Sequence, residues 1–124
     1  MTIGFERTVP ILRIFSEEKA KEFYLGFLGF TLDWEHRFEP GMPLYMQVSR
    51  AGLVLHLSEH HGDGAPGATV FVETAGLDAG PQVLVVLCRD LGVECIEDAP
   101  WGARVMTVID PFSNRIRFSE RTRS

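Results

Sequence analysis

The sequence predicts an α+β fold in which one βαβββ module occurs twice within a single domain of 124 residues. Strand, helix and three further strands follow one another in residues 8–58 and again in residues 68–120, with a linker over 59–67. The two helices end alike, in Leu28-Gly29-Phe30 and in Leu91-Gly92-Val93. The last strands also end alike, two residues after His56 and two residues after Arg117, each in a serine. Such internal repetition predicts one supersecondary unit used twice.

Composition restricts the class of protein. The hydrophobic share of 45% and the charged share of 23% are ordinary for a soluble globular chain. A net charge of −5 argues against nucleic acid as a partner, because binding phosphates requires a basic surface. No stretch approaches the roughly 18 apolar residues of a membrane span, so we expect no membrane partner and a cytoplasmic location. Cys88 and Cys95 lack a C-x-x-C spacing and are expected to be small core residues.

The first module begins with a strand over 8–15, and Pro10 is expected near its start or on an edge because it cannot donate to a ladder. Ser16 is a typical helix cap, followed by two glutamates in the first turn, where carboxylates suit the helix dipole. Gly29 ends this helix. The spacing i, i+3, i+4, i+7, i+8 predicts one apolar face made of Ala20, Phe23, Tyr24, Phe27 and Leu28.

Three strands complete the first module. Residues 30–38 alternate between apolar and polar side chains, which predicts one strand face carrying Phe30, Leu32, Trp34, His36 and Phe38. A turn at 40–43 leads into strands over 44–49 and 53–58. The linker over 59–67 contains the glycine-rich stretch HHGDGAPG.

The second module repeats this order. A strand over 68–74 precedes a helix that Asp78 and Pro81 open, since proline in the first turn loses no helical hydrogen bond. The apolar face of this helix comprises Val83, Leu84, Leu87, Cys88 and Leu91, and Gly92 ends it. Strands over 93–98, 103–109 and 115–119 follow, with turns at 99–102 and 110–114.

Several stretches resemble one family. VPILRIFSEEKAKEFYLGFLGF is similar to the first strand and helix of the vicinal oxygen chelate superfamily, also called the glyoxalase/bleomycin-resistance/dioxygenase fold. PWGARVMTVIDPFSNRIRFSE resembles the ending of the bleomycin resistance branch, and GLD at 76–78 fits the same branch. The resemblance spans residues 8–120. It implies curved mixed sheets around a concave cavity, and a homodimer with grooves between subunits and the strand near Pro10 exchanged.

The resemblance also implies four positions at which superfamily enzymes hold a divalent metal. In this chain they fall at Val9, His56, Thr69 and Arg117. A catalytic metal needs about three imidazole, thiolate or carboxylate ligands, and only His56 qualifies. Arg117 carries a fixed positive charge that would repel a cation. We therefore expect no metal ligand and no cofactor at these positions.

His60, His61 and Asp63 are a second metal candidate. They lie in the glycine-rich linker after the strand, without a cysteine nearby. A polar turn is the alternative, and Asp63-Gly64 is typical of one.

The resemblance implies a ligand groove lined by aromatic residues at the places of Trp34, Phe71 and Trp101. Phe38 shares the predicted face of Trp34, and His56 and Arg117 are expected to face the cavity. Aromatic walls suit planar ligands through offset stacking. Packing in the core is the alternative role for the aromatics, and a hydrogen-bonded, half-buried position is the alternative for His56. Acidic residues that could attract a basic ligand are Asp33, Glu35, Glu39, Glu97 and Asp98.

These observations leave three hypotheses. The first is a metal-free protein that sequesters an aromatic, antibiotic-like small molecule, for which a positive charge is one option, in a dimer-interface groove. Its ligand-binding residues would be Trp34, Phe38, His56, Phe71, Trp101 and Arg117, with no catalytic residue assigned. The second is a divergent metal-dependent enzyme of the superfamily, a lyase, dioxygenase or thiol transferase. The third is a binding module for an unrelated metabolite or protein.

Overall fold

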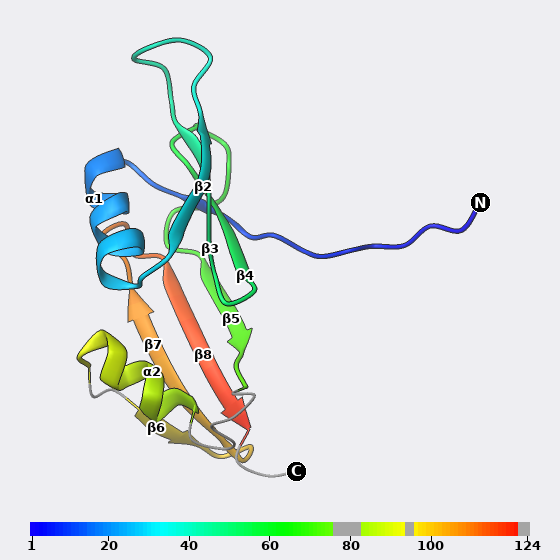
Figure 1. Cartoon of the computed structure of the whole chain (residues 1–124), viewed down its shortest axis with the longest axis vertical. Coiled ribbons are helices and arrows are strands. Elements are labelled where there is room, and N and C mark those ends of the chain that lie inside the picture. The colour runs from blue at the N-terminus through cyan, green and yellow to red at the C-terminus, as the bar shows by residue number, and fades with distance from the viewer. Residues whose placement is uncertain (76–82, 94–95, 122–124) are drawn as a thin grey trace. The chain divides into compact units, whose positions relative to one another are not determined.

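The computed structural model describes residues 1–75, 83–93 and 96–121, and these form two compact units, Met1–Pro66 and Gly67–Ser124. Unit 1 and unit 2 are treated separately below. Each contains a four-stranded mixed sheet and a helical segment (Figure 1). The α+β fold of two repeated modules is thereby confirmed.

The sheet of unit 1 has the strand order β1-β4-β3-β2. Strand β1 is parallel to β4, and the other neighbours are antiparallel. Its strands are β1 (Ile11–Arg13), β2 (Thr31–His36), β3 (Tyr45–Arg50) and β4 (Leu53–Ser58). The first and last strands of the module therefore pair along their length, which brings Ile11 beside His56.

Strand β1 is shorter than the predicted strand over 8–15. Pro10 stands directly before it, as expected, and its carbonyl accepts a hydrogen bond from the His56 N–H at 2.9 Å. Residues 1–10 form no helix or strand, and Ile3 and Phe5 are 76% and 97% exposed.

The predicted single α-helix is wrong in its second half. Ser16 caps α1 (Glu17–Lys21) by accepting from the Lys19 N–H, as expected, but a π-helical segment η1 (Glu22–Phe27) follows. The Leu28 N–H donates to the carbonyl of Phe23, five residues back. This wider turn changes the rotation of later side chains, so that Leu28 is buried whereas Phe27 is exposed.

Strand β2 does not keep the uninterrupted alternation predicted for 30–38. Leu32 pairs with Val48, whereas Trp34 pairs with Gln47, the very next residue of β3. Asp33 is therefore an extra residue, and such a β-bulge transfers the following side chains to the other face. Leu32 and Trp34 consequently lie on opposite faces of the sheet.

The two faces of this sheet differ in burial. The face that packs on the helix, here the helix face, is apolar and contains Leu12, Ile14, Met46, Val48, Leu55 and Leu57, all at most 1% exposed. The opposite face, here the open face, contains Tyr45, Gln47 and His56, each half-buried. This second face is where polar chemistry is available in unit 1.

Unit 2 repeats the topology with the order β5-β8-β7-β6, and β5 is parallel to β8. Its elements are β5 (Thr69–Glu73), α2 (Val83–Leu91), β6 (Ile96–Ala99), β7 (Ala103–Ile109) and β8 (Arg115–Arg121). Gly29 and Gly92 have nearly equal positive φ angles of 74° and 73°, which glycine adopts without a steric cost. The matched helix endings of the sequence thus correspond to matched backbone conformations.

Helix α2 packs on β6, β7 and β8. Cys88 is buried, as expected, and its thiol lies 3.0 Å from the Met106 sulfur. The expected helix start at Asp78 and Pro81 and the core position of Cys95 lie outside the described residues. Within the described part of the chain, no helix is long and apolar enough to cross a membrane.

The turn between β7 and β8 is closed by Asp110 and Asn114. Asp110 accepts from the backbone N–H groups of Phe112 and Asn114 at 2.8 Å, and from the Asn114 side-chain amide at 2.9 Å. The side-chain oxygen Oδ1 of Asn114 accepts from the Ala68 N–H at 3.2 Å. The Asp-Pro-x-x-Asn motif therefore forms the turn and also fixes the residue that precedes β5.

Candidate functional site

A cluster of three rings occupies the open face of unit 1. Trp34 stacks on Tyr45 with ring centroids 6.0 Å apart and planes at 10°. The edge of His56 meets both rings, at 5.3 Å from Trp34 and 5.1 Å from Tyr45. Cross-strand register positions the cluster, because Gln47 pairs with both Trp34 and His56. The bulge at Asp33 is thus what brings Trp34 to His56.

Hydrogen bonds link this cluster into one chain. The Tyr45 hydroxyl lies 2.7 Å from Nδ1 of His56, and Nε2 of His56 lies 3.0 Å from Oε1 of Gln47. The Gln47 amide donates to Oδ2 of Asp33 at 3.0 Å, and the Ser49 hydroxyl donates to Oδ1 at 3.0 Å. The chain spans three strands of the sheet.

The carboxylate of Asp33 determines the proton positions along this chain. It can only accept, so the amide nitrogen of Gln47 faces it and the amide oxygen faces His56. His56 must then donate through Nε2, which leaves Nδ1 to accept from the Tyr45 hydroxyl. On the neutral ring, this arrangement selects the tautomer with its proton on Nε2.

The environment shifts three pKa values in this cluster. Burial lowers the pKa of His56 below 6.5, and the positive charge of Arg7 lowers it further. Burial, and then the negative charge of Asp63, raises the pKa of Tyr45 above 10.0. Hydrogen bonds from Gln47 and Ser49 lower the pKa of Asp33 below 3.8. Each shift favours the protonation state that the chain of hydrogen bonds requires.

The superfamily metal does not fit the residues at the four implied positions. Val9 and Thr69 offer no imidazole, thiolate or carboxylate, and Arg117 is a cation. Both ring nitrogens of His56 already have hydrogen-bond partners. Among the described residues, no three histidine, cysteine, aspartate or glutamate side chains converge as a metal site would require.

The linker histidines belong to a hydrogen-bonded turn. Asp63 accepts from the Ser58 hydroxyl at 2.9 Å, and the Ser58 oxygen accepts from the His60 N–H at 3.0 Å. The Asp63 N–H donates to the His60 carbonyl at 3.2 Å. His61 is exposed. These contacts favour the polar-turn interpretation of residues 60–64.

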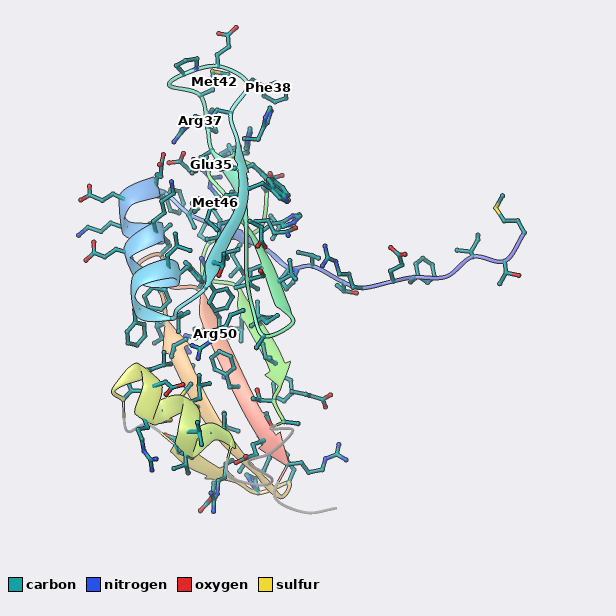
Figure 2. All side chains as sticks on the ribbon, in the orientation of Figure 1. Glu35, Arg37, Phe38, Met42, Met46 and Arg50 are labelled. Atoms are coloured by element: carbon teal, nitrogen blue, oxygen red, sulfur yellow. The ribbon has the colours of Figure 1, made fainter. Side chains whose placement is uncertain are left out.

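Phe38 lies apart from the cluster. Strand β2 ends at His36, and Phe38 follows in the β2–β3 loop, where it is 75% exposed and contacts the His36 ring at 5.1 Å. Figure 2 shows Phe38 and Met42 together in this loop. The alternation that predicted a shared face with Trp34 does not extend beyond the strand.

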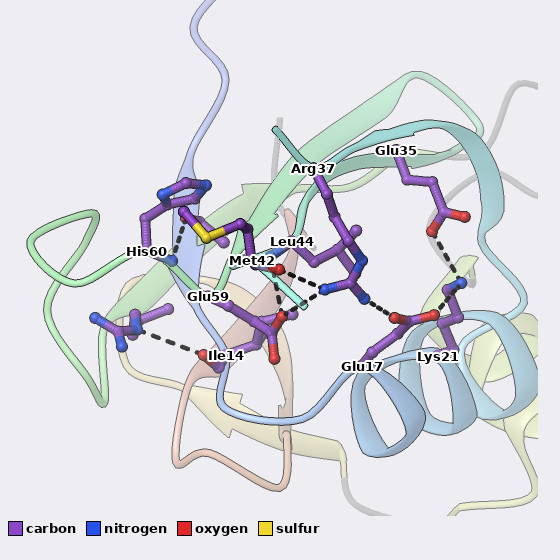
Figure 3. A network of polar contacts seen from close by, with 11 residues as sticks. Ile14, Glu17, Lys21, Glu35, Arg37, Met42, Leu44, Glu59 and His60 are labelled. Atoms are coloured by element: carbon purple, nitrogen blue, oxygen red, sulfur yellow. Dashed lines mark hydrogen bonds and ion pairs between the residues drawn. The ribbon is translucent and has the colours of Figure 1, made fainter. Parts of the chain in front are cut away.

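An ionic network attaches this loop to the helix (Figure 3). Arg37 contacts the Glu17 carboxylate, lies 3.6 Å from that of Glu59, and donates to the Met42 carbonyl at 2.7 Å. Lys21 bridges Glu17 and Glu35, both at 2.9 Å. Lys21 lowers the pKa of Glu17 below 4.5 through its hydrogen bond, and the charges of Lys21 and Arg37 add to this.

The second set of predicted site residues lies in unit 2, where a groove of about 700 Å³ opens on the sheet. Phe71 and Trp101 are 52% and 65% exposed along it. Phe71 is the middle residue of β5, and Trp101 is held in the tight turn between β6 and β7, where the Gly102 N–H donates to the Ala99 carbonyl. The residues that line the groove are Phe71, Glu73, Thr74, Ala75, Trp101, Gly102, Ala103, Ser119 and Arg121.

Arg117 lies next to this groove on β8. It pairs with Phe71 on one side and with Thr107 on the other, and it is half-buried. Register therefore brings Phe71 and Arg117 together, and Trp101 lines the same groove as Phe71. Trp34 and His56 belong to the ring cluster of unit 1.

Sequence reasoning missed Tyr45 and Gln47 in unit 1, and Ser119 and Arg121 in unit 2. The alternation in LYMQVS and RIRFSER could have indicated all four, since every second residue of a strand shares a face.

Three solved structures show the same fold at low sequence identity. The bleomycin-binding protein of Streptomyces verticillus, complexed with copper(II)-bleomycin, is 22% identical, with 94% of this chain and 97% of that chain covered and a TM-score of 0.67. The bleomycin resistance determinant encoded on transposon Tn5 is 18% identical, with 94% and 98% covered and a TM-score of 0.66. TnmS3, an antibiotic binding protein from Streptomyces sp. CB03234, is 21% identical, with 99% of both chains covered and a TM-score of 0.62.

No curated protein sequence matches the chain. A family profile described as "Glyoxalase superfamily protein" matches residues 1–124. The resemblance inferred from the strand, helix and Asp-Pro-x-x-Asn motifs is thereby confirmed: the chain belongs to the glyoxalase superfamily.

Proposed function

We propose that this protein is a metal-free binding protein that captures an aromatic small molecule in the groove of unit 2. One observation carries the proposal: two large aromatic side chains, Phe71 and Trp101, stay exposed along a groove of about 700 Å³. Pockets for drug-sized molecules have volumes of roughly 300–1,000 Å³. The groove therefore has the size that such a ligand needs, with two aromatic rings and several polar groups in its lining.

Exposed aromatics on a sheet suit planar ligands. A ring that inserts beside Phe71 or Trp101 removes apolar surface from water and gains offset or edge contacts, which add roughly 0.5–1.5 kcal/mol per ring pair beyond burial. The remaining lining supplies a hydroxyl, a carboxylate and a guanidinium from Ser119, Glu73 and Arg121. Such groups orient a ligand whose affinity comes mainly from the rings.

Related structures support capture as the activity. One similar structure is of a bleomycin-binding protein complexed with copper(II)-bleomycin, and another is of an antibiotic binding protein. By analogy, we propose that this chain also acts by stoichiometric capture of an antibiotic-like molecule.

The donor set also favours capture over a metal-dependent reaction. Of the four implied metal positions, only His56 offers a ligand atom, and both its nitrogens are hydrogen-bonded to Tyr45 and Gln47. We infer that the hydrogen-bonded residues around His56 hold the Trp34 ring in place and that this ring contacts a ligand.

We further propose that the working form is a homodimer. Ile3 and Phe5 project from an irregular N-terminal segment with 76% and 97% of their surface exposed, and a second subunit would cover such side chains. Light scattering at micromolar concentration should give twice the chain mass of 13.9 kDa. A double variant, Ile3→Asp with Phe5→Asp, should shift the protein toward the monomer. A wild-type monomer at 100 µM would rule out the dimer.

The capture proposal is tested by titrating the protein with bleomycin and with the neutral aromatic N-phenyl-1-naphthylamine while tryptophan fluorescence is followed. We expect saturable quenching for at least one of the two, at one ligand per chain, reduced at least tenfold in affinity by Phe71→Ala. The matched control is Phe38→Ala, which removes an exposed phenylalanine from unit 1.

Recovery of the ligand after a long incubation separates capture from catalysis. The proposal requires chemically unchanged ligand with or without added Zn²⁺, Mn²⁺ or Fe²⁺. Conversion of the ligand that depends on an added metal would establish the enzyme alternative instead.

A further inference from the structure

One strand of unit 2 carries a row of arginines on a single face. On β8, residues 115, 117, 119 and 121 share a face because strand side chains alternate. Three of these four are arginine, and the fourth, Ser119, has a buried side chain. The row is notable in a chain whose net charge is −5.

This face is the one that bears the groove. Phe71 and Glu73 of β5 pair with Arg117 and Ser119 of β8, so they lie on the same side of the sheet. Arg121 itself lines the groove, together with Ser119. Arg117 stands two residues before Ser119 and is in register with Phe71, in the middle of this pair of strands.

Among the described residues, Arg117 and Arg121 form no ion pair with a carboxylate. In the part of the chain that the structure describes, neither Arg117 nor Arg121 lies within 4.0 Å of a carboxylate oxygen. Arg37 and Arg104, by contrast, do contact carboxylates. Two guanidinium groups beside an aromatic groove therefore keep their donors available for a ligand.

We propose that Arg117 and Arg121 form an anion-binding subsite of the groove, and that the ligand is an aromatic compound that carries a carboxylate, sulfonate or similar anionic group. This inference rests on the proposed capture function and specifies its ligand class. The aromatic part contacts Phe71 and Trp101, and the anionic group lies over Ser119, between the two arginines.

The chemistry of the side chains supports this arrangement. Guanidinium groups present paired N–H donors that match the two oxygens of a carboxylate or sulfonate. The Ser119 hydroxyl adds a donor from the floor of the groove. Glu73, also in the lining, is paired with Ser119, so its negative charge opposes an anion there. The two guanidinium groups outnumber this one carboxylate and leave the subsite with a net positive charge.

Three of the five acidic residues that suggested a cationic ligand have partners elsewhere in the described part of the chain. Glu35 is paired with Lys21, and Asp33 accepts hydrogen bonds from Gln47 and Ser49. Asp98 lies 4.0 Å from Arg104. The charge beside the groove is therefore better matched to an anionic ligand than to the cationic ligand that the sequence left as one option.

The test compares two fluorescent probes that share one ring system. 8-Anilino-1-naphthalenesulfonate carries a sulfonate, and N-phenyl-1-naphthylamine is its uncharged counterpart. Both are titrated into the wild-type full chain and into Arg117→Gln and Arg121→Gln at 150 mM NaCl. Loss of one guanidinium contact should reduce the affinity for the sulfonate probe roughly five- to tenfold in each variant. The affinity for the neutral probe should fall less than twofold.

Arg115→Gln is the matched control. It removes the same charge from the same strand face, but it lies four residues from Ser119, about 13 Å along the strand from the proposed place of the anion. That distance exceeds the screening length of roughly 8 Å at this salt. The control should change the affinity of the sulfonate probe less than twofold.

Circular dichroism spectra of all variants verify that they are folded. The anion subsite would be overturned if the arginine variants bound both probes with equally reduced affinity, or bound both with unchanged affinity. If the anion subsite is overturned but Phe71→Ala abolishes binding of the neutral probe, the proposed capture function stands without the subsite. Neutral-probe binding that Phe71→Ala and Trp101→Ala leave unchanged would overturn the groove itself, and the subsite with it.

Discussion

Replacing Tyr45 by phenylalanine removes a single hydrogen-bond donor and keeps the ring that stacks on Trp34. The lost bond runs from the hydroxyl to Nδ1 of His56 over 2.7 Å. A neutral hydrogen bond contributes a net of roughly 0.5–1.5 kcal/mol to stability. Because both side chains are only half-buried, water can partly replace the donor, so about 0.5–1 kcal/mol is expected here. With a urea slope near 2 kcal/mol/M, the unfolding midpoint falls by roughly 0.25–0.5 M.

The same substitution changes the titration of His56. The hydroxyl donates to a lone pair that exists only on the neutral ring, so it favours neutral His56. Its removal should raise the pKa of His56 toward 6.5 from the lowered value that burial and Arg7 produce. The imidazole Cε1 proton, followed by NMR against pH, reports this change directly.

A double-mutant cycle with His56→Phe isolates the pair. The cycle should give a coupling free energy of about 0.5–1 kcal/mol between Tyr45 and His56, measured by urea unfolding at pH 8. A coupling near zero, or a His56 pKa that falls in Tyr45→Phe, would refute the tautomer and donor assignments made above.

Three further predictions concern stability. Arg37→Met should lower the free energy of unfolding by about 1 kcal/mol, because two carboxylates and a carbonyl lose their partner. The difference from the wild type should shrink in 1 M NaCl. Equal urea midpoints of variant and wild type at low salt would contradict the prediction. Gly64→Ala should cost about 2 kcal/mol or more, since a Cβ there would lie 2.7 Å from the Ile11 carbonyl oxygen at φ +66°. Gly62→Ala, at φ +96° with open space around it, is the control and should cost only about 1 kcal/mol in the same urea assay. Because the pKa of His56 in the folded protein lies below 6.5, its contribution to stability is complete above pH 6.5 and is lost as the pH falls toward the folded pKa. His56→Gln should therefore flatten this part of the plot of urea midpoint against pH. A wild-type midpoint that rises on acidification relative to the variant would contradict the direction of the pKa shift.

The repeat, the succession of strands and helix along each module and the family were predictable, because they depend on patterns that persist over many residues. Helix endings such as Leu28-Gly29 and Leu91-Gly92 and the Asp110–Asn114 turn are local signals with one structural meaning. They recur in both modules, and this repetition makes each signal stronger than it would be alone.

Two departures in unit 1 were not predictable from alternation or helical spacing. The bulge at Asp33 and the π-helical turn before Leu28 each insert one residue into a regular element. Such insertions are stabilised by tertiary contacts, here the hydrogen bonds of Asp33 to β3. Because a single inserted residue rotates everything after it, Trp34 joined the open face and Phe27 left the core.

The sequence indicated which residue types a ligand site could contain, but not which of these residues lie together in the structure. Phe71 and Trp101 line one groove, but Phe38 stands apart because the strand ends before it. The arginine row on β8 was visible in RIRFSER, yet its meaning depended on register, which shows Arg117 beside Phe71.

The most direct test of the account is to locate the bound ligand in solution. Amide ¹H–¹⁵N spectra of the full chain, titrated with N-phenyl-1-naphthylamine, report which residues contact it. The account predicts the largest shifts at Phe71, Glu73, Trp101, Ser119 and Arg121, the groove of unit 2. Shifts confined to Trp34, Tyr45 and His56 in unit 1, with unit 2 unchanged, would contradict it.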